Sequence, residues 1–259
     1  MGKLIFISIL VALFQLPGDF PLKKGKPTGK GVGMYVEQKA PSVLAEFQNY
    51  VKDTLYDVWF YSSDEKDVMD PDQNELGRHY PNEIYIAEAG EFVAYELADL
   101  TARQQKSYRE CNRFVKTVML HELCHEYVYQ LSVEMEALLR LPVDRAYRTG
   151  VWIVVSHETY GSSFVHEGLS EYLCGAMGEL ISPAEHAAPA SVAELLDRDR
   201  QYEMKYKYGA AFLKPFLDTI GFKKGVQVLL HNPPPSHEEI LEPGRFFSRL
   251  IIPELLAGR

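Results

Sequence analysis

The sequence is short of cysteine: its 259 residues include three, and no two of them form a Cys-x-x-Cys pair. This excludes a zinc ribbon or a thioredoxin-type redox site and gives no sign of a disulfide framework. Basic side chains are also in deficit, with 27 Lys and Arg against 36 Asp and Glu and a net charge of −9. Nucleic-acid binders need a basic face to neutralise phosphates, so the balance argues against nucleic acid as a partner.

Internal repeats, low-complexity tracts and multiple membrane-length apolar runs are absent from the sequence as well. One apolar run, Leu4 to Phe14, has the length of a signal-peptide core and predicts N-terminal membrane association or export. No small-x-small cleavage site follows it, and lysines do, which fits a buried strand instead. The sequence favours export or anchoring slightly over the strand. Residues 17–33, rich in Gly, Pro and Lys, are expected to form a linker.

Hydrophobic periodicity predicts strands at 56–62 and 83–89, with a polar, turn-rich loop at 62–82 between them. The same pattern predicts helices at 41–55, 92–131 (continuing to Pro142), 160–181 and 207–221. Strands and helices come first and helices alone follow, which indicates an α+β fold with a mainly helical C-terminal half. The expected organisation is an apolar segment and linker at 1–33, an α/β part at 34–150 and a helical part at 151–259.

Capping residues and a proline give more detailed predictions for helices in the C-terminal half. Ser162 or Ser163 is the expected N-cap of the 160–181 helix. Pro215 is expected to kink the helix that contains it. Ser236 and Glu239 have the spacing of a capping box and predict a short final helix.

The chemical signal lies in "MLHELCHEYV", residues 119–128. His121 and His125 are four residues apart, so both imidazoles project from one face of a helix. In this motif two neutral imidazoles bind Zn²⁺ and the glutamate, here Glu122, takes a proton from the bound water. Glu122 also interrupts an apolar run, where an unpaired buried charge would cost several kcal/mol. The pattern therefore predicts one zinc ion per chain.

A zinc site of this kind needs a third protein ligand. Metzincins use a His six residues past the second His, after an intervening Gly; those positions are Leu131 and Val128 here, which excludes that class. Glutamates nearby on the same helical region lie too close along the chain to swing back. The best candidate is Glu167 on a second helix, because Gly168 beside it allows this helix and the motif helix to approach closely. Glu171 one turn later is placed to accept the N–H of a ligating His.

The motif followed by "EGLSEY" resembles the gluzincin metallopeptidases, which include thermolysin-like and aminopeptidase-N-like enzymes. The resemblance covers about residues 110–225. It implies that His121, His125 and Glu167 bind zinc and that Glu171 accepts a hydrogen bond from a ligating His. "YKYG" at 206–209 resembles the Tyr-x-x-Gly helix of the aminopeptidase-like members. There the Tyr donates a hydrogen bond to the tetrahedral intermediate, a role that passes to Tyr206, with Tyr208 as a rival.

Two departures limit the resemblance. The gap from His125 to Glu167 is 42 positions (167 minus 125), longer than in those families, and no Gly-x-Met-Glu-Asn segment lies upstream. An aminopeptidase reaction is therefore not implied. The segment "EIYIAEA" at 83–89 is expected to be an edge strand able to pair with an extended substrate.

The sequence thus predicts a zincin-like core and a zinc-dependent hydrolase that cleaves peptide bonds, with Glu122 as general base and Tyr206 as oxyanion donor. The expected partner is a peptide or protein substrate. Two alternatives stay open: a zinc-binding protein that acts through a protein partner without catalysis, and a helical scaffold without metal.

Overall fold

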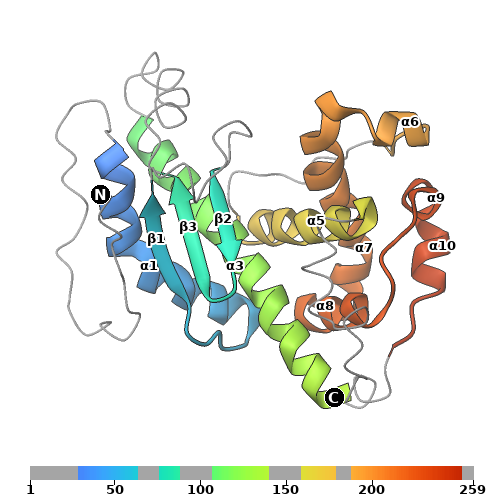
Figure 1. The fold of residues 1–259 in the computed structure, drawn as a ribbon, viewed down its shortest axis with the longest axis horizontal. Coiled ribbons are helices and arrows are strands. Elements are labelled where there is room, and N and C mark those ends of the chain that lie inside the picture. The colour runs from blue at the N-terminus through green and yellow to red at the C-terminus, as the bar shows by residue number, and fades with distance from the viewer. Residues whose placement is uncertain (1–28, 64–75, 88–106, 140–158, 179–187, 253–259) are drawn as a thin grey trace. The chain divides into compact units, whose positions relative to one another are not determined.

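The computed structural model describes residues 29–63, 76–87, 107–139, 159–178 and 188–252 (Figure 1). The chain divides into two compact units, Met1–Glu126 and Tyr127–Arg259. The apolar run at 4–14 and the expected boundary at 150/151 both lie outside the described residues. Within the described ranges, no helix combines the length and the apolar character needed to cross a membrane.

The first unit contains a three-stranded sheet in the order β1-β3-β2. Strand β1 (Trp59–Ser63) runs parallel to β3 (Glu83–Ala87), and β2 (Gly77–Tyr80) runs antiparallel to it. The two predicted strands are present with shorter bounds. The prediction of a loop throughout 62–82 is wrong, because β2 lies inside it and is defined by its pairing with β3 rather than by an apolar pattern. The edge-strand prediction for 83–89 is also wrong, since β3 pairs on both sides.

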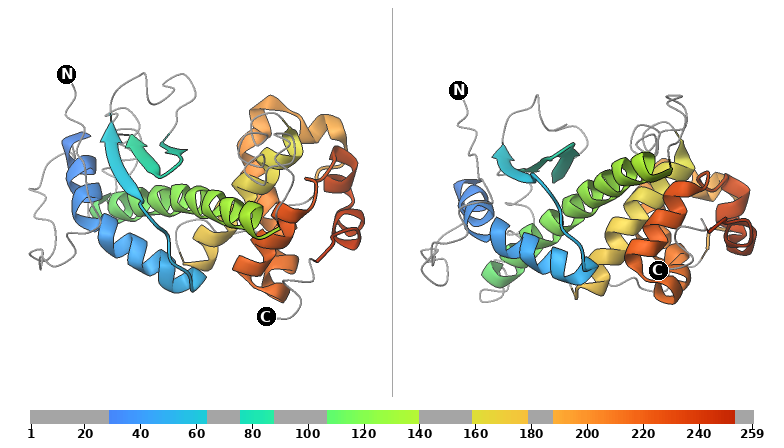
Figure 2. Two further views of the ribbon diagram at one scale, coloured as in Figure 1. Left: turned by 60° about the horizontal axis from the view of Figure 1, so that its bottom comes forward. Right: turned by 90° about the horizontal axis from the view of Figure 1, so that it is seen from below.

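Helix α1 (Gly29–Val51) packs on this sheet (Figures 1 and 2). Apolar side chains at helical spacing on α1, including Val43 and Phe47, are buried together with Phe60 and Ile84 of the sheet. The helix begins before the predicted residue 41 and overlaps the expected linker, and it contains Pro41. Its core-facing stripe explains why burial sustains it past the proline.

Helix α3 (Ser107–Leu139) carries the His-Glu-x-x-His motif. The predicted helix is present, and its middle part is apolar and buried almost all round. Nearly every residue from Met119 to Val128 is buried there, while His121 keeps partial exposure. On the outer side of the first unit, Lys116 of α3 donates to Glu46 of α1. The predicted start of this helix, before residue 107, lies outside the described residues.

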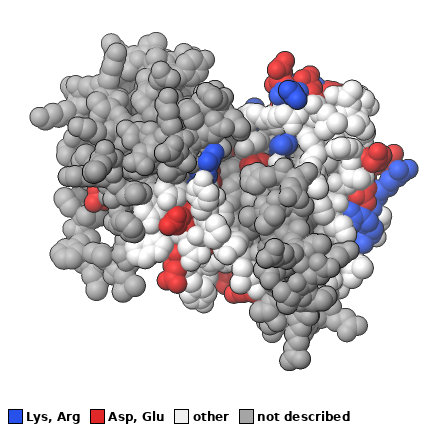
Figure 3. Space-filling view, viewed as in Figure 1, with Lys and Arg blue, Asp and Glu red and all other residues white. Residues whose placement is uncertain are grey.

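The second unit is helical in its described residues (Figure 1). Its elements are α5 (Tyr160–Ala176), α6 (Val192–Leu195), the 3₁₀ turn η4 (Arg198–Arg200), the π-helix η5 (Tyr202–Tyr208), α7 (Gly209–Ile220), α8 (Phe222–His231), α9 (His237–Leu241) and α10 (Pro243–Ser248). Helix α5 packs against both η5 and α7. Lys/Arg and Asp/Glu side chains of the described residues are interspersed on the face in Figure 3.

The first residues of α5 and α9 test the predictions of an N-cap and of a capping box. Thr159, not Ser162 or Ser163, is the N-cap of α5, and its side chain accepts from the Ser162 N–H. The capping box of Ser236 and Glu239 is confirmed at the start of α9. Thr159 was missed because several hydroxyl residues follow one another there, and only the extended backbone of Thr159 identifies the cap.

Two glycines bring α5 and α7 into backbone contact. A Cβ added to Gly168 would lie 2.6 Å from the Gly209 carbonyl carbon, and a Cβ on Gly209 would lie 2.9 Å from the Phe164 carbonyl oxygen. The prediction assigned the close approach at Gly168 to the motif helix, whereas the contact that this glycine makes is with α7. The glycine next to Glu167 fixes where α5 sits in its own unit.

Candidate metal centre

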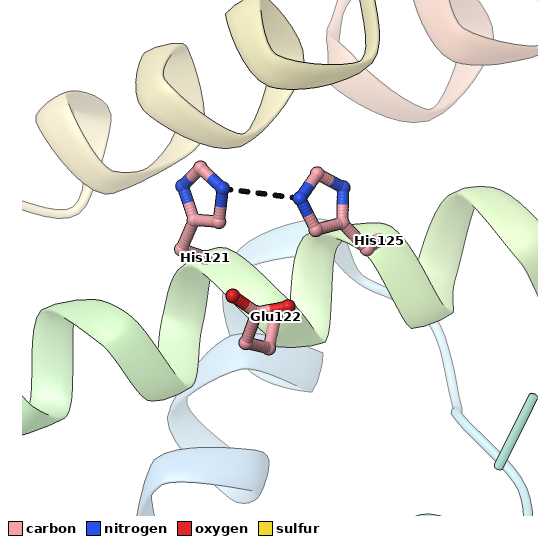
Figure 4. A group of neighbouring side chains, drawn as sticks. All are labelled: His121, Glu122 and His125. Atoms are coloured by element: carbon pink, nitrogen blue, oxygen red, sulfur yellow. Dashed lines mark hydrogen bonds between the residues drawn. The ribbon is translucent and has the colours of Figure 1, made fainter. Parts of the chain in front are cut away.

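The two motif histidines converge on one side of α3 (Figure 4). The Nε2 atoms of His121 and His125 are 3.0 Å apart, and their rings meet edge to face with centroids separated by 4.7 Å. Local helix geometry accounts for this, because residues four apart stand one above the other on the same face. His125 is buried and His121 is partly exposed, so one flank of the pair remains open to solvent.

The spacing of the two nitrogens fits a shared metal ion. Two nitrogens bound at 2.0–2.1 Å to a tetrahedral zinc lie about 3.3 Å from each other. The observed 3.0 Å is close to that value. The same distance also suits a hydrogen bond between two neutral imidazoles, with one nitrogen donating and the other accepting. The pair is therefore held in an arrangement that zinc can enter with little movement.

Glu122 supplies the third group of this cluster. Ligand-capable atoms of His121, Glu122 and His125 all lie within 4.8 Å of one another. The Glu122 side chain is only 6% exposed, on a face of α3 that differs from the histidine face (Figure 4). Two imidazoles with one nearby carboxylate form the donor set that binds Zn²⁺ and moves a proton at its water.

Strand β2 lies directly against Glu122. Gly77 has no side chain at this point, and an added Cβ would lie 2.5 Å from Glu122 Oε1 and 2.8 Å from Val118 Cγ1. The carboxylate therefore occupies space that any other residue at position 77 would fill. Sequence reasoning assigned this segment to a surface loop and had no means to detect the contact.

A second carboxylate on α3, Glu126, is one of the nearby glutamates that lie too close along the chain to be a ligand, and it has a different role. It is fully buried, and its Oε2 accepts from the Asn82 backbone N–H at 2.9 Å and lies 2.7 Å from His79 Nε2. Asn82 has a positive φ of 68° in the turn that joins β2 to β3. The detectable signal was a glutamate one turn after Glu122 in an otherwise apolar helix.

The remaining predicted residues lie in the second unit. Glu167 and Glu171 stand one turn apart on α5; Glu167 is half-buried and Glu171 is 1% exposed. Burial lowers the pKa of Lys205, and the negative charge of Glu167 partly offsets this. Burial and the Glu171 carboxylate raise the pKa of Tyr202 to about 12. These effects show that η5 and the acidic positions of α5 share one electrostatic neighbourhood.

The two candidate tyrosines differ in how their hydroxyls are used. Tyr208 is buried, and its hydroxyl donates to the Ile240 carbonyl at 2.9 Å. Tyr206 is half-buried and packs its ring against Tyr202, with centroids 4.9 Å apart. Both belong to η5, a π-helical segment of a kind often found at functional sites. The Tyr208 hydroxyl is therefore engaged in holding η5 to α9.

The structure thus brings His121, Glu122 and His125 together in the first unit and places Glu167, Glu171 and Tyr206 on packed elements of the second. Comparison with protein-family models, curated proteins and solved structures finds no match to this chain.

Proposed function

We propose that this protein is a zinc-dependent hydrolase that cleaves peptide bonds, built on a zincin-like core. The observation that carries the proposal is the cluster on α3: two imidazole nitrogens 3.0 Å apart with the Glu122 carboxylate close by. The gluzincin-like order of motifs adds Glu167 as the third ligand. A half-buried carboxylate directly before the helix-contact glycine Gly168 is a suitable donor for that role.

Each residue of the proposed site has a defined task. His121, His125 and Glu167 hold the ion, and Glu171 accepts the free N–H of a ligating imidazole to fix its orientation. Zinc, when bound, polarises the scissile carbonyl and makes its water a nucleophile near neutral pH. The Glu122 carboxylate takes a proton from the attacking water and passes it to the leaving amine. The Tyr206 hydroxyl donates a hydrogen bond to the carbonyl oxygen as that oxygen gains charge.

Glu122 is what favours catalysis over a structural zinc site. Structural zinc sites are closed by four protein ligands and have no use for a base. Here a buried carboxylate stands beside two histidines, and one of these keeps partial exposure through which a substrate can approach. A non-catalytic zinc-binding protein remains the alternative that the following experiment separates.

The test is zinc content by mass spectrometry together with hydrolysis of a quenched fluorescent peptide library. The variants are His121→Ala, Glu167→Ala and Glu122→Gln, with Glu134→Ala, an exposed position on α3, as the matched control. We expect about one zinc per chain in the wild type and in the control, and loss of zinc in the two ligand variants. Glu122→Gln should keep zinc and lose hydrolysis by a factor of about 10² to 10⁴.

Other outcomes would contradict specific parts of the proposed function. Zinc without hydrolysis of any library peptide favours the non-catalytic alternative. Zinc retained in Glu167→Ala removes that residue from the ligand set and leaves the motif intact. Absence of zinc from the wild type, purified without chelators, overturns the whole proposal.

A further inference from the structure

We infer that strand β2 positions the general base. Gly77 leaves the space that the Glu122 carboxylate occupies, and the contact between His79 and Glu126, called the clamp below, holds the strand against α3. Gly77, His79 and Glu126 are thus positioning residues that act through Glu122. This inference rests on the proposed function, because it assigns these residues a part in the reaction.

The spacing along the two elements matches. Gly77 and His79 are two residues apart, so they share one face of β2 and lie about 6.8 Å apart along it. Glu122 and Glu126 are four residues apart, so they share one face of α3 and lie about 6 Å apart along its axis. Gly77 meets Glu122, and His79 meets Glu126. Strand β2 therefore runs along the face of α3 that carries the two glutamates, which is not the face that carries the two histidines.

The Gly77 contact defines the carboxylate position sterically. The atoms nearest to an added Cβ are Glu122 Oε1 at 2.5 Å, Glu122 Cγ at 2.7 Å and Val118 Cγ1 at 2.8 Å. Distances below 3.0 Å require something to move, and two of the three atoms belong to the base itself. Any side chain at position 77 would therefore move the carboxylate, whereas the imidazoles of His121 and His125 are not among the nearest atoms.

The clamp keeps β2 at this distance. Glu126 is fully buried and the His79 side chain is 6% exposed, so water competes little for their 2.7 Å contact. The Asn82 N–H adds a second donor to the same Oε2 atom and ties the β2–β3 turn to the helix. Because β2 is four residues long, these two contacts and its pairing with β3 determine where Gly77 lies.

The test compares Gly77→Ala with Gly244→Ala, a helical glycine with open space around an added Cβ. Rates on the most rapidly cleaved peptide of the quenched library, KM, zinc content and thermal unfolding are measured for each variant. Gly77→Ala should lower kcat by about 10²-fold, the effect of a misplacement near 1 Å, with KM and zinc close to wild type. Gly244→Ala should behave as wild type.

A second pair of variants tests the clamp. His79→Ala removes the contact to Glu126, whereas His79→Gln keeps an N–H donor that can reach the same carboxylate. His79→Ala should lower kcat while zinc stays bound, and His79→Gln should recover most of the lost rate. A purely structural role would change stability and zinc content along with kcat and would show no selective recovery.

The outcomes separate the inference from the proposed function. Full activity in Glu122→Gln overturns the proposed function. An inactive Glu122→Gln beside a fully active Gly77→Ala overturns the positioning inference and leaves the function standing. If Gly77→Ala does not fold, the triple variant that adds Glu122→Ala and Val118→Ala decides, because it removes all three atoms nearest to the new Cβ. Recovery of folding supports the contact, and continued failure to fold refutes it.

Discussion

The helix contact at Gly168 gives a prediction whose size follows from the structure. In Gly168→Ala the new Cβ would meet the Gly209 carbonyl carbon at 2.6 Å and the Gly209 Cα and oxygen at 2.9 Å. These are backbone atoms of α7, which cannot rotate away as a side-chain end would. Overpacking of this kind costs about 1–3 kcal/mol, and the rigid neighbour places it at the upper end.

A helix-propensity gain opposes that cost. Replacing glycine by alanine inside a helix stabilises it by about 1 kcal/mol, so the net loss should be about 2 kcal/mol. For a chain of this size, 1 kcal/mol shifts Tm by about 2–4 °C, which gives an expected decrease of about 4–8 °C. Under the proposed ligand role of Glu167, which precedes Gly168 in α5, displacement of the helix should also weaken zinc binding.

The assay is unfolding by heat and urea, followed by circular dichroism at 222 nm. Gly244→Ala is the control, because it gains the same propensity in α10 and its Cβ meets no atom within 4 Å. The control should be neutral or slightly stabilised. A Gly168→Ala protein with unchanged or higher stability would refute the close α5–α7 contact and the role assigned to this glycine.

Two further predictions concern hydroxyl and carboxyl groups of the second unit. Tyr208→Phe should cost about 1 kcal/mol of stability through its lost hydrogen bond and keep hydrolysis. Tyr206→Phe should lower kcat, and the reverse pattern of kcat effects would exchange their roles. The hydrogen bond from Arg249 holds the pKa of Glu239 below its usual 4.5 in the folded state. The stabilisation from this hydrogen bond is therefore present above about pH 4.5 and is lost as the pH falls further. In urea unfolding, the free energy of unfolding of Glu239→Gln should thus depend less on pH than that of the wild type. An identical pH dependence in both would contradict this.

Sequence reasoning was most accurate where a structural feature depends on residues close along the chain. The convergence of His121 and His125 follows from helical periodicity alone, as does the capping box at Ser236. The buried character of α3 was equally visible, because apolar residues cover almost all of its circumference. The α+β class follows from the order of the elements.

Sequence reasoning failed where a segment takes its structure from distant partners. Strand β2 has a polar sequence with a glycine, and its extended form depends on β3 and on contact with α3. The edge-strand prediction for 83–89 failed for the same reason, since pairing on both sides of a strand leaves no local pattern.

The sequence by itself therefore determined the His-Glu-x-x-His motif, the helix that carries it and the class of the fold, because helix periodicity and capping act over four residues or fewer. Only the tertiary structure decided what surrounds the motif. Glu126 meets His79 across 47 positions, Gly168 meets Gly209, and Gly77 leaves the space that Glu122 fills. Such contacts depend on how elements pack in three dimensions, and the chemical type of each residue alone does not specify its partner.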